Sequence, residues 1–369
     1  MIPVNRPVLG GNEQKYLAEC IATGWISSEG PFVKALEAKF AQFMGCEHGI
    51  AVCNGSLAID LALAALRIGP GDEVILPTFT IISCAAAVVR AGAVPVVVDC
   101  AADTWNIDPA LIAAKLTPRT KAIMAVHIYG LPVDMAPVLD IARAHGLAVI
   151  EDAAEQHGQT YHGKPVGSLG DIATVSFYPN KHVTTGEGGM VLTNDAALAE
   201  RCRRLRNLAF DAERRFIHDE LGWNLRMSNL QAAVGVAQLE RVDESLRRKR
   251  QIGAWYQEHF RGHPLLQLPL ERTAYAENLY WVFAVVLDDR VPFDAREAIA
   301  RLRANGIDAR HFFWPMHEQP ALRKLGHFAG ERCPVAERIA RRGLYLPSGI
   351  GTTRAEVDKS AAALQDVLK

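Results

Sequence analysis

Five short apolar segments are the feature that most constrains the fold of this 369-residue chain. They occupy residues 73–77, 94–99, 122–127, 148–152 and 172–178. Helical patterns near residues 80–91, 108–116 and 134–145 separate the first four of them. Continuous apolar strands separated by helices are typical of a mostly parallel sheet with both faces covered. We therefore predict an α/β fold, in which ligands bind at the carboxyl ends of the strands.

The segment Ser176–Met190 follows one apolar strand pattern and precedes another, and it places Lys181 where a strand ends in a loop. Pro179 cannot continue a strand's ladder of hydrogen bonds, and the glycines at 186, 188 and 189 permit a tight turn. A lysine that apolar neighbours desolvate has a lowered pKa and becomes a better nucleophile toward a carbonyl. Taken alone, however, this pattern favours a solvated turn lysine.

Two other residues at strand ends favour a chemical role for Lys181. Asp152 ends the apolar run 147–152, and Ser176 lies five residues before the lysine. Pyridoxal phosphate requires this set of groups, because a lysine forms a Schiff base with it, an acid keeps its pyridine nitrogen protonated, and a hydroxyl donates to its phosphate. The glycine turn at residues 54–56, between a short strand and a helix, is a candidate phosphate cradle, since the free amides at the start of a helix attract anions.

Six parts of the sequence resemble the motifs of one known family: Gly24–Ser28, Asn54–Ser56, Glu151–Glu155, Ser176 with Lys181, Thr185–Met190 and Asn224–Met227. Along nearly its whole length the chain is similar to the DegT/DnrJ/EryC1/StrS sugar aminotransferases, which are pyridoxal-phosphate enzymes of fold type I. The resemblance implies a large α/β/α sandwich domain and a smaller C-terminal α+β domain. We expect the large domain, with an N-terminal strap, to span residues 1–255 and the small domain residues 256–369.

The resemblance also implies roles for single residues. Lys181 and Asp152 would be catalytic, as the Schiff-base residue and the partner of the pyridine nitrogen. Asn224, followed by Arg226, would reach the cofactor phosphate of the neighbouring subunit, so that a symmetric homodimer would be the catalytic unit. Glu155 would lie near the ring oxygen of the cofactor. In all, seven residues would bind pyridoxal phosphate: Gly55, Ser56, Asp152, Glu155, Ser176, Lys181 and Asn224.

Five residues are candidates for the substrate side of the pocket: Trp25, Ser27, His127, Arg310 and His317. The segment that contains Trp25 and Ser27 is equally compatible with a strap packed on the surface. His127 follows an apolar strand, where a buried histidine with satisfied hydrogen bonds is the other explanation. Arg310 and His317 belong to an aromatic segment that reaches toward the sugar nucleotide in this family.

The resemblance also implies a particular reaction and substrate. Segments 25–28, 121–124, 184–190 and 237–240 are most similar to the branch of the family that converts GDP-4-keto-6-deoxymannose to GDP-perosamine with L-glutamate as the amine donor, for polysaccharide or glycoside synthesis. A dTDP- or UDP-linked keto sugar is the alternative. Ile81 stands where relatives often place an aromatic ring over the cofactor, and it offers apolar contact without π-stacking.

Two further functions remain as alternatives. One is a sugar dehydratase of the same family, in which a histidine replaces the lysine, and the other is a cofactor-binding regulator without turnover. Lys181 argues against the dehydratase, because it fills the Schiff-base position although His182 is adjacent. The intact set of lysine, aspartate and serine argues against the regulator.

The composition argues against several other classes of function. Forty basic and forty-one acidic residues leave a net charge of −1, which does not suit a nucleic-acid surface or a polybasic membrane anchor. Seven cysteines without a C-x-x-C pair do not suit a metal site or a redox motif, and fit a reducing cytosol. The first residues lack an apolar core of signal-peptide length, and residues 85–98 are too short to span a bilayer. We expect a cytoplasmic protein with no metal, nucleic-acid or membrane partner.

A capping box formed by Ser228 and Gln231 predicts the start of a long helix that continues to about Phe260, with Gly253 as the point where it would break. Such a helix can tie one domain to the next. A second capping box at Thr353 predicts the start of the last helix.

Overall fold

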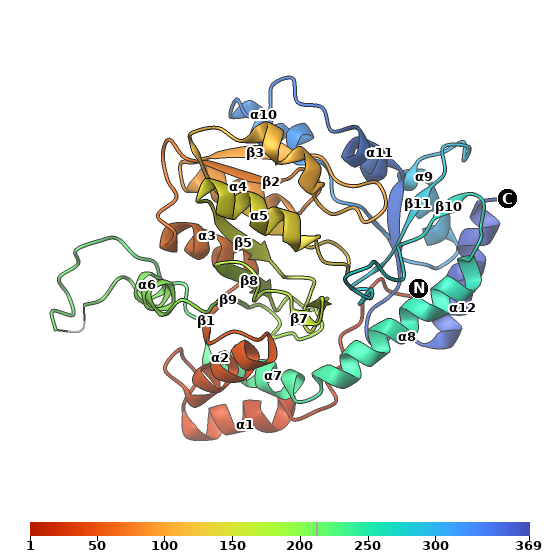
Figure 1. The fold of residues 1–369 in the computed structure, drawn as a ribbon. Helices are drawn as coiled ribbons and strands as arrows, with labels where there is room; N and C mark the ends of the chain where they lie inside the picture. Colours follow the sequence, from red (N-terminus) through yellow and green to blue (C-terminus); the bar gives the residue numbers. More distant parts are fainter. Residues whose placement is uncertain (212) are drawn as a thin grey trace.

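The computed structural model describes residues 1–211 and 213–369 and is built around one seven-stranded sheet (Figure 1). The strand order is β1-β9-β8-β5-β4-β2-β3. The strands are β1 (His48–Val52), β2 (Glu73–Pro77), β3 (Val94–Val98), β4 (Thr120–Val126), β5 (Ala148–Asp152), β8 (Ile172–Ser176) and β9 (Gly189–Thr193). All neighbouring pairs are parallel except those that involve β9. The predicted α/β fold with a mostly parallel sheet is confirmed.

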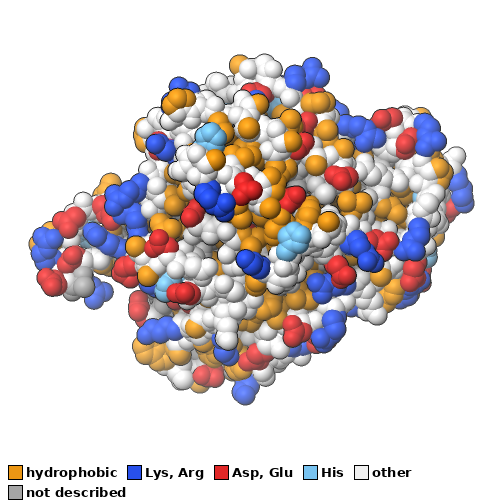
Figure 2. All heavy atoms as spheres, in the orientation of Figure 1, with side chains coloured by type: hydrophobic (Ala, Val, Ile, Leu, Met, Phe, Trp, Pro, Cys, Tyr) orange, Lys and Arg blue, Asp and Glu red, His pale blue; other side chains and the backbone are white. Residues whose placement is uncertain are grey.

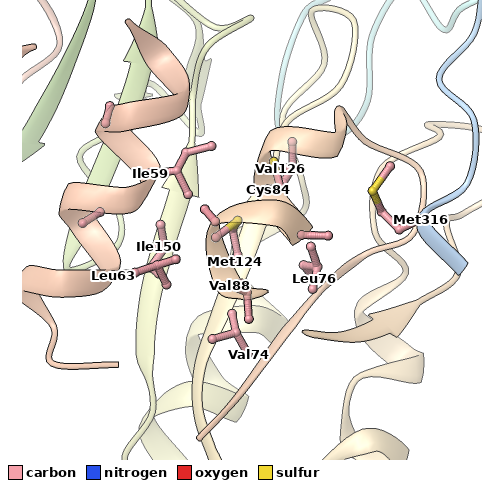
Figure 3. Packing of buried hydrophobic residues seen from close by; sticks show 14 of the residues in the cluster. Ile59, Leu63, Val74, Leu76, Cys84, Val88, Met124, Val126, Ile150 and Met316 are labelled. Carbon is pink, nitrogen blue, oxygen red and sulfur yellow. The ribbon is translucent and has the colours of Figure 1, made fainter. Parts of the chain in front are cut away.

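Helices cover both faces of this sheet, and each face has its own apolar core. One core joins the sheet to α3 (Gly55–Ala65), α4 (Ile82–Arg90) and α6 (Ala196–Arg206); the other joins it to α2 (Pro31–Phe43), α5 (Met135–His145) and α7 (Asn229–Leu239). Along β2, Val74 and Leu76 belong to the first core and Ile75 to the second, as the alternation of side chains in a strand requires. Figure 3 shows part of the first core, where side chains of α3 and α4 face those of the strands (Ile59, Leu63, Cys84, Val88, Val74, Met124 and Ile150).

A second, antiparallel sheet has the order β10-β11-β13-β12 and a third apolar core. Its strands are β10 (Leu266–Gln267), β11 (Phe283–Leu287), β12 (Arg310–His311) and β13 (Gly343–Leu346). The helices α9 (Ala295–Ala304) and α12 (Arg354–Val367) contribute to this core. The first residues of the chain join it as well, because Ile2 forms a β-bridge with Ile307 and the carbonyl of Val4 accepts a hydrogen bond from the amide of Ser348.

The helix α8 (Val242–Phe260) extends from beside α7, on the large sheet, to the small sheet (Figure 1). Its first half buries Leu246 in the second core of the large sheet, and its second half buries Tyr256 and Phe260 in the core of the small sheet. The predicted domain boundary between residues 255 and 256 falls inside this helix. The division of the chain into two domains at that point stays a prediction.

Two helix predictions need correction. The helix that begins with the confirmed capping box at Ser228 ends at Leu239, and α8 starts anew at Val242, so the break lies before Gly253 rather than at it. The pattern at residues 108–116 forms only the short 3₁₀ turns Pro109–Leu111 and Ala113–Lys115. Only Ile112 of that segment is buried, so that there is little packing to stabilise a longer helix.

The outer surface mixes charges of both signs. Figure 2 shows Lys and Arg side chains interspersed with Asp and Glu over the face that it draws. In the part of the chain that the structure describes, we find no helix with the length and apolar character needed to cross a membrane.

Close packing against Tyr280 explains why residue 253 is a glycine. A Cβ atom at this position would lie 2.3 Å from the ring of Tyr280. We expect Gly253→Ala to lower stability, because overpacking costs about 1–3 kcal/mol and exceeds the roughly 1 kcal/mol gain in helix propensity. The neighbouring exposed residue gives the control: Ala254→Gly should lose about 1 kcal/mol through propensity alone. Urea unfolding measures both, and a more stable Gly253→Ala variant would contradict the packing argument.

Candidate active site

A cavity of about 380 Å³ lies at the carboxyl ends of the parallel strands. The residues that follow β5 and β8 line one side of it, and the starts of α3 and α4 line another. Asp152, Ser176 and Lys181 all border this space, together with Glu155. The sequence prediction that these strand ends share one site agrees with this geometry.

The start of α3 forms an anion cradle. The side chain of Asn54 caps the helix by accepting a hydrogen bond from the amide of Leu57 at 2.9 Å. A Cβ atom on Gly55 would lie 2.7 Å from Cβ of Ser176, so that only glycine permits this close approach. The hydroxyl of Ser56 lies 2.8 Å from that of Ser83, at the start of α4. Free helix amides and hydroxyls that line the same cavity are suited to a phosphate group.

Lys181 is buried against a carboxylate. Its Nζ atom lies 3.9 Å from Oε1 of Glu155, and only 10% and 8% of the two side chains are exposed. Burial lowers the pKa of Lys181, although the charges of Glu155 and Asp152 oppose the effect. Burial likewise raises the pKa of Glu155, whose carboxylate accepts a hydrogen bond from the amide of Tyr129. A desolvated lysine of this kind has the lowered pKa that nucleophilic attack on a carbonyl requires.

The carboxylate of Asp152 is held on both oxygens. Oδ1 accepts a hydrogen bond from the amide of Ala154 at 3.1 Å, and Oδ2 accepts one from the thiol of Cys84 at 3.3 Å. The side chain is buried and borders the cavity. It is therefore an oriented acceptor at the wall of the cavity.

Trp281 is a residue of this site that the sequence did not indicate. Its ring centroid lies 4.0 Å from Nζ of Lys181, and its Nε1–H donates to the carbonyl of Asn180 at 2.9 Å. Phe313 and Tyr345 also line the cavity from the C-terminal part of the chain. The available signal was the aromatic content of the segments before β11 and after β12, but a one-dimensional pattern does not say which aromatic ring reaches Lys181.

Residues of its own chain engage the side chain of His127, for which a substrate contact is predicted. This side chain borders the cavity but is fully buried. Its Nδ1 accepts a hydrogen bond from the amide of Val133 at 3.0 Å, so Nε2 carries the proton and donates to Glu151 at 3.2 Å. With both nitrogen atoms engaged, this geometry favours the alternative explanation of a satisfied buried histidine, and the substrate contact stays a prediction.

His317 is likewise engaged by residues of its own chain, and its substrate contact stays a prediction. Its ring is buried outside the cavity, with Nδ1 2.7 Å from the hydroxyl of Thr78 and Nε2 3.2 Å from Glu337. Glu318 lies near enough for a three-residue metal site. Arg341 and Arg332 already pair with Glu318 and Glu337, which explains the group as an ion-pair network.

Four other predicted residues lie outside the cavity of their own chain: Trp25, Ser27, Asn224 and Arg310. The carbonyls of Trp25 and Ser27 accept hydrogen bonds from Asn229, which fixes the strap on α7. Arg310 is exposed and pairs with Asp308. Asn224 is exposed as well. Their functional roles stay predictions.

The residues present fit pyridoxal phosphate. The helix start and the hydroxyls of Ser56, Ser83 and Ser176 suit its phosphate, the buried carboxylate of Asp152 suits a protonated pyridine nitrogen, and Lys181 suits its carbonyl group. The glycine at position 55 leaves room for a ligand against the backbone. Each group of the cofactor thus has a chemical partner in the cavity.

Comparison with known proteins agrees with this fit. Residues 7–365 match the DegT/DnrJ/EryC1/StrS aminotransferase family. The chain is 46% identical to a GDP-perosamine synthase of Caulobacter vibrioides, over 100% of this chain and 98% of that protein. It is 43% identical to a UDP-N-acetyl-3-dehydro-alpha-D-glucosamine 3-aminotransferase of Acidithiobacillus ferrooxidans, over 85% of this chain and 82% of that one. The crystal structure of the aminotransferase TlmJ from Streptoalloteichus hindustanus superposes with a TM-score of 0.93 at 31% identity, covering 100% of this chain and 99% of that chain.

The fold and the site define a pyridoxal-phosphate enzyme of fold type I. More particularly, the chain belongs to the DegT/DnrJ/EryC1/StrS aminotransferase family, whose match covers nearly all of it.

The role of His127 can be tested. We expect His127→Ala to lower the free energy of unfolding by about 2 kcal/mol or more, because it removes a buried hydrogen-bonded side chain between Glu151 and Val133. Thermal unfolding measures this loss. Substrate KM values should stay within about twofold, because His127 presents no free polar atom to the cavity. A large rise in KM without loss of stability would restore the substrate-binding role.

Proposed function

We propose that this enzyme transfers an amino group from L-glutamate to C4 of a nucleotide-linked 4-keto-6-deoxy sugar, with GDP-4-keto-6-deoxymannose as acceptor and GDP-perosamine as product. The observation that carries the aminotransferase chemistry is the grouping of Lys181, Glu155 and Asp152 beside the anion cradle. The similarity to the Caulobacter vibrioides protein over its whole length supports the choice of acceptor.

When bound, pyridoxal phosphate supplies a carbonyl that takes up the amino group and a ring that withdraws electrons from the reacting carbon. Asp152 holds the proton on the ring nitrogen, and its two hydrogen bonds keep it oriented for this task. Lys181 moves a proton at Nζ, and burial lowers its pKa so that the amine gives up its proton more readily. Trp281 covers Nζ and excludes water from it.

A second copy of the chain completes the proposed site. Beside the cavity lies an open groove of about 1020 Å³, which shares Asn54 and Ser56 with it and is lined on its far side by Trp223 and Leu225. Half of Tyr178 and nearly half of Trp223 are exposed there. Asn224 lies between Trp223 and Leu225, which supports its assignment to the partner's cofactor phosphate in a symmetric homodimer.

The runner-up acceptor is a UDP- or dTDP-linked keto sugar. The similarity to the Acidithiobacillus ferrooxidans aminotransferase, which acts on a UDP-linked sugar, favours it. Ile81 borders the cavity without an aromatic ring and is consistent with either acceptor. The dehydratase alternative is weakened further because His182 is buried away from the cavity and cannot take the place of Lys181.

The cellular role follows from the product. An amino sugar nucleotide of this kind is a donor for lipopolysaccharide O-antigen or another glycan, and we place the enzyme in the cytoplasm, where sugar nucleotides are made.

Two variants test the chemistry. Lys181→Ala should abolish amine transfer, because proton movement at the reacting carbon depends on its Nζ. Asp152→Ala should lower kcat by two orders of magnitude or more, roughly the effect of losing an electrostatic group at the reacting centre. Both rates are measured by 2-oxoglutarate release from glutamate. Full activity of either variant would refute its assignment.

A substrate panel tests the acceptor. The purified enzyme, glutamate and one of the GDP-, dTDP- or UDP-linked keto sugars are incubated, and the product is identified by mass spectrometry. We expect amination of the GDP sugar, with the other two at least about tenfold slower in kcat/KM, because the nucleotide contributes binding energy to the transition state. Exclusive use of a dTDP or UDP sugar would overturn the GDP assignment.

Subunit complementation tests the shared site. Lys181→Ala and Asn224→Ala subunits each disable both sites of their own homodimer, whereas a mixed dimer holds one site with neither change. We expect an equimolar mixture to recover about a quarter of wild-type activity if subunits exchange at random. A parallel mixture of Lys181→Ala with Asp152→Ala, which both lie in one cavity, should recover none. Full activity of Asn224→Ala by itself, or of a monomer in solution, would contradict the shared site.

A further inference from the structure

Cys84 stands out among the cysteines because it contacts Asp152. It lies in the first turn of α4 and faces the sheet (Figure 3), with none of its surface exposed. Its Sγ atom is 3.3 Å from Oδ2 of Asp152 and 3.4 Å from the hydroxyl of Thr80. Within the described residues, Cys84 is the only side chain that donates a hydrogen bond to the carboxylate of Asp152; the other donor to this carboxylate is the backbone amide of Ala154.

The direction of this bond follows from the chemistry of the two groups. Burial raises the pKa of the Cys84 thiol well above its usual range, and the charge of Asp152 adds to the effect. The thiol therefore keeps its proton and donates it. Together with the amide of Ala154 it fixes the plane of the carboxylate, because the two oxygens are held by different parts of the chain, α4 and the turn after β5.

The strength of the donor matters as well as its position. A thiol is a weak hydrogen-bond donor, whereas a hydroxyl at the same place would draw more charge from the carboxylate. A weak donor orients Asp152 and leaves most of its negative charge for the opposite partner, a protonated ring nitrogen. Cys84 thus orients the carboxylate and also leaves most of its charge free. A serine would draw away more of that charge, and an alanine would not orient the carboxylate.

We propose that Cys84 is a positioning residue of this aminotransferase, which holds the carboxylate of Asp152 toward the pyridine nitrogen. This inference rests on the cofactor assignment and not on the identity of the sugar acceptor. The role of Cys84 can therefore be refuted without refuting the proposed acceptor, and the acceptor can be refuted without refuting the role of Cys84.

The test compares Cys84→Ala and Cys84→Ser with matched changes at Cys202. Cys202 is also fully buried in the same core, on α6, and does not border the cavity. The readouts are the dissociation constant of pyridoxal phosphate from the protein, the pH midpoint of the bound cofactor's visible absorbance change, and the thermal unfolding temperature. We expect Cys84→Ala to weaken cofactor binding by about fivefold to tenfold, as for the loss of a hydrogen bond to a charged group.

Cys84→Ser should bind the cofactor within about twofold of the wild type, since a donor is retained, and should shift the pH midpoint by a measurable fraction of a unit, since the donor is stronger. The Cys202 variants should lower the unfolding temperature without changing either cofactor property. In an Asp152→Ala background, Cys84→Ala should have no further effect on cofactor binding, because both changes remove the same interaction. Additive effects, or a Cys84→Ala variant that behaves like Cys202→Ala, would overturn the proposal.

Discussion

Lys181 and the two carboxylates near it are almost fully buried, and the chemistry of the site depends on this desolvation. An exposed lysine would be an ammonium ion at neutral pH and a poor nucleophile. Burial alone would make the charged form costly, and Glu155 at 3.9 Å offsets part of that cost. Burial therefore lowers the pKa of an amine that, in the proposed reaction, must both accept and donate a proton.

Distant parts of the chain hold the groups around Lys181 in place. The large sheet delivers Asp152 and Lys181 to one edge, while Trp281 comes from the segment before β11 of the small sheet. Lys249 on α8 donates hydrogen bonds to the carbonyls of Trp281 and Ser348, so the backbone of Trp281 is anchored to the helix that joins both sheets. The geometry at Nζ of Lys181 thus depends on packing between α8, the small sheet and the loop of residues 177–188.

Sequence reasoning predicted the part of the site that topology determines. In a parallel sheet the carboxyl ends of strands meet at one edge, and this places Asp152, Ser176 and Lys181 together regardless of details. The same reasoning could not decide the role of His127, because a position at a strand end does not say where the side chain points, and this one turns toward Glu151. Contacts such as that between residues 181 and 281 result from tertiary packing, and no local pattern encodes them. The sequence also suggested Gly253 as the point where the long helix breaks. The tertiary contact with Tyr280 accounts for this glycine instead, and the break lies between Leu239 and Val242.

The opening residues of the chain are held by partners close to its other end, since Ile2 is bridged to Ile307 and Val4 is bonded to Ser348. A ribosome makes the chain from the amino terminus, so neither partner exists while the large sheet is being synthesised. The segment around Ile2 and Val4 is consequently among the last to reach its final place, because it lacks these native contacts until residues 307 and 348 have been made.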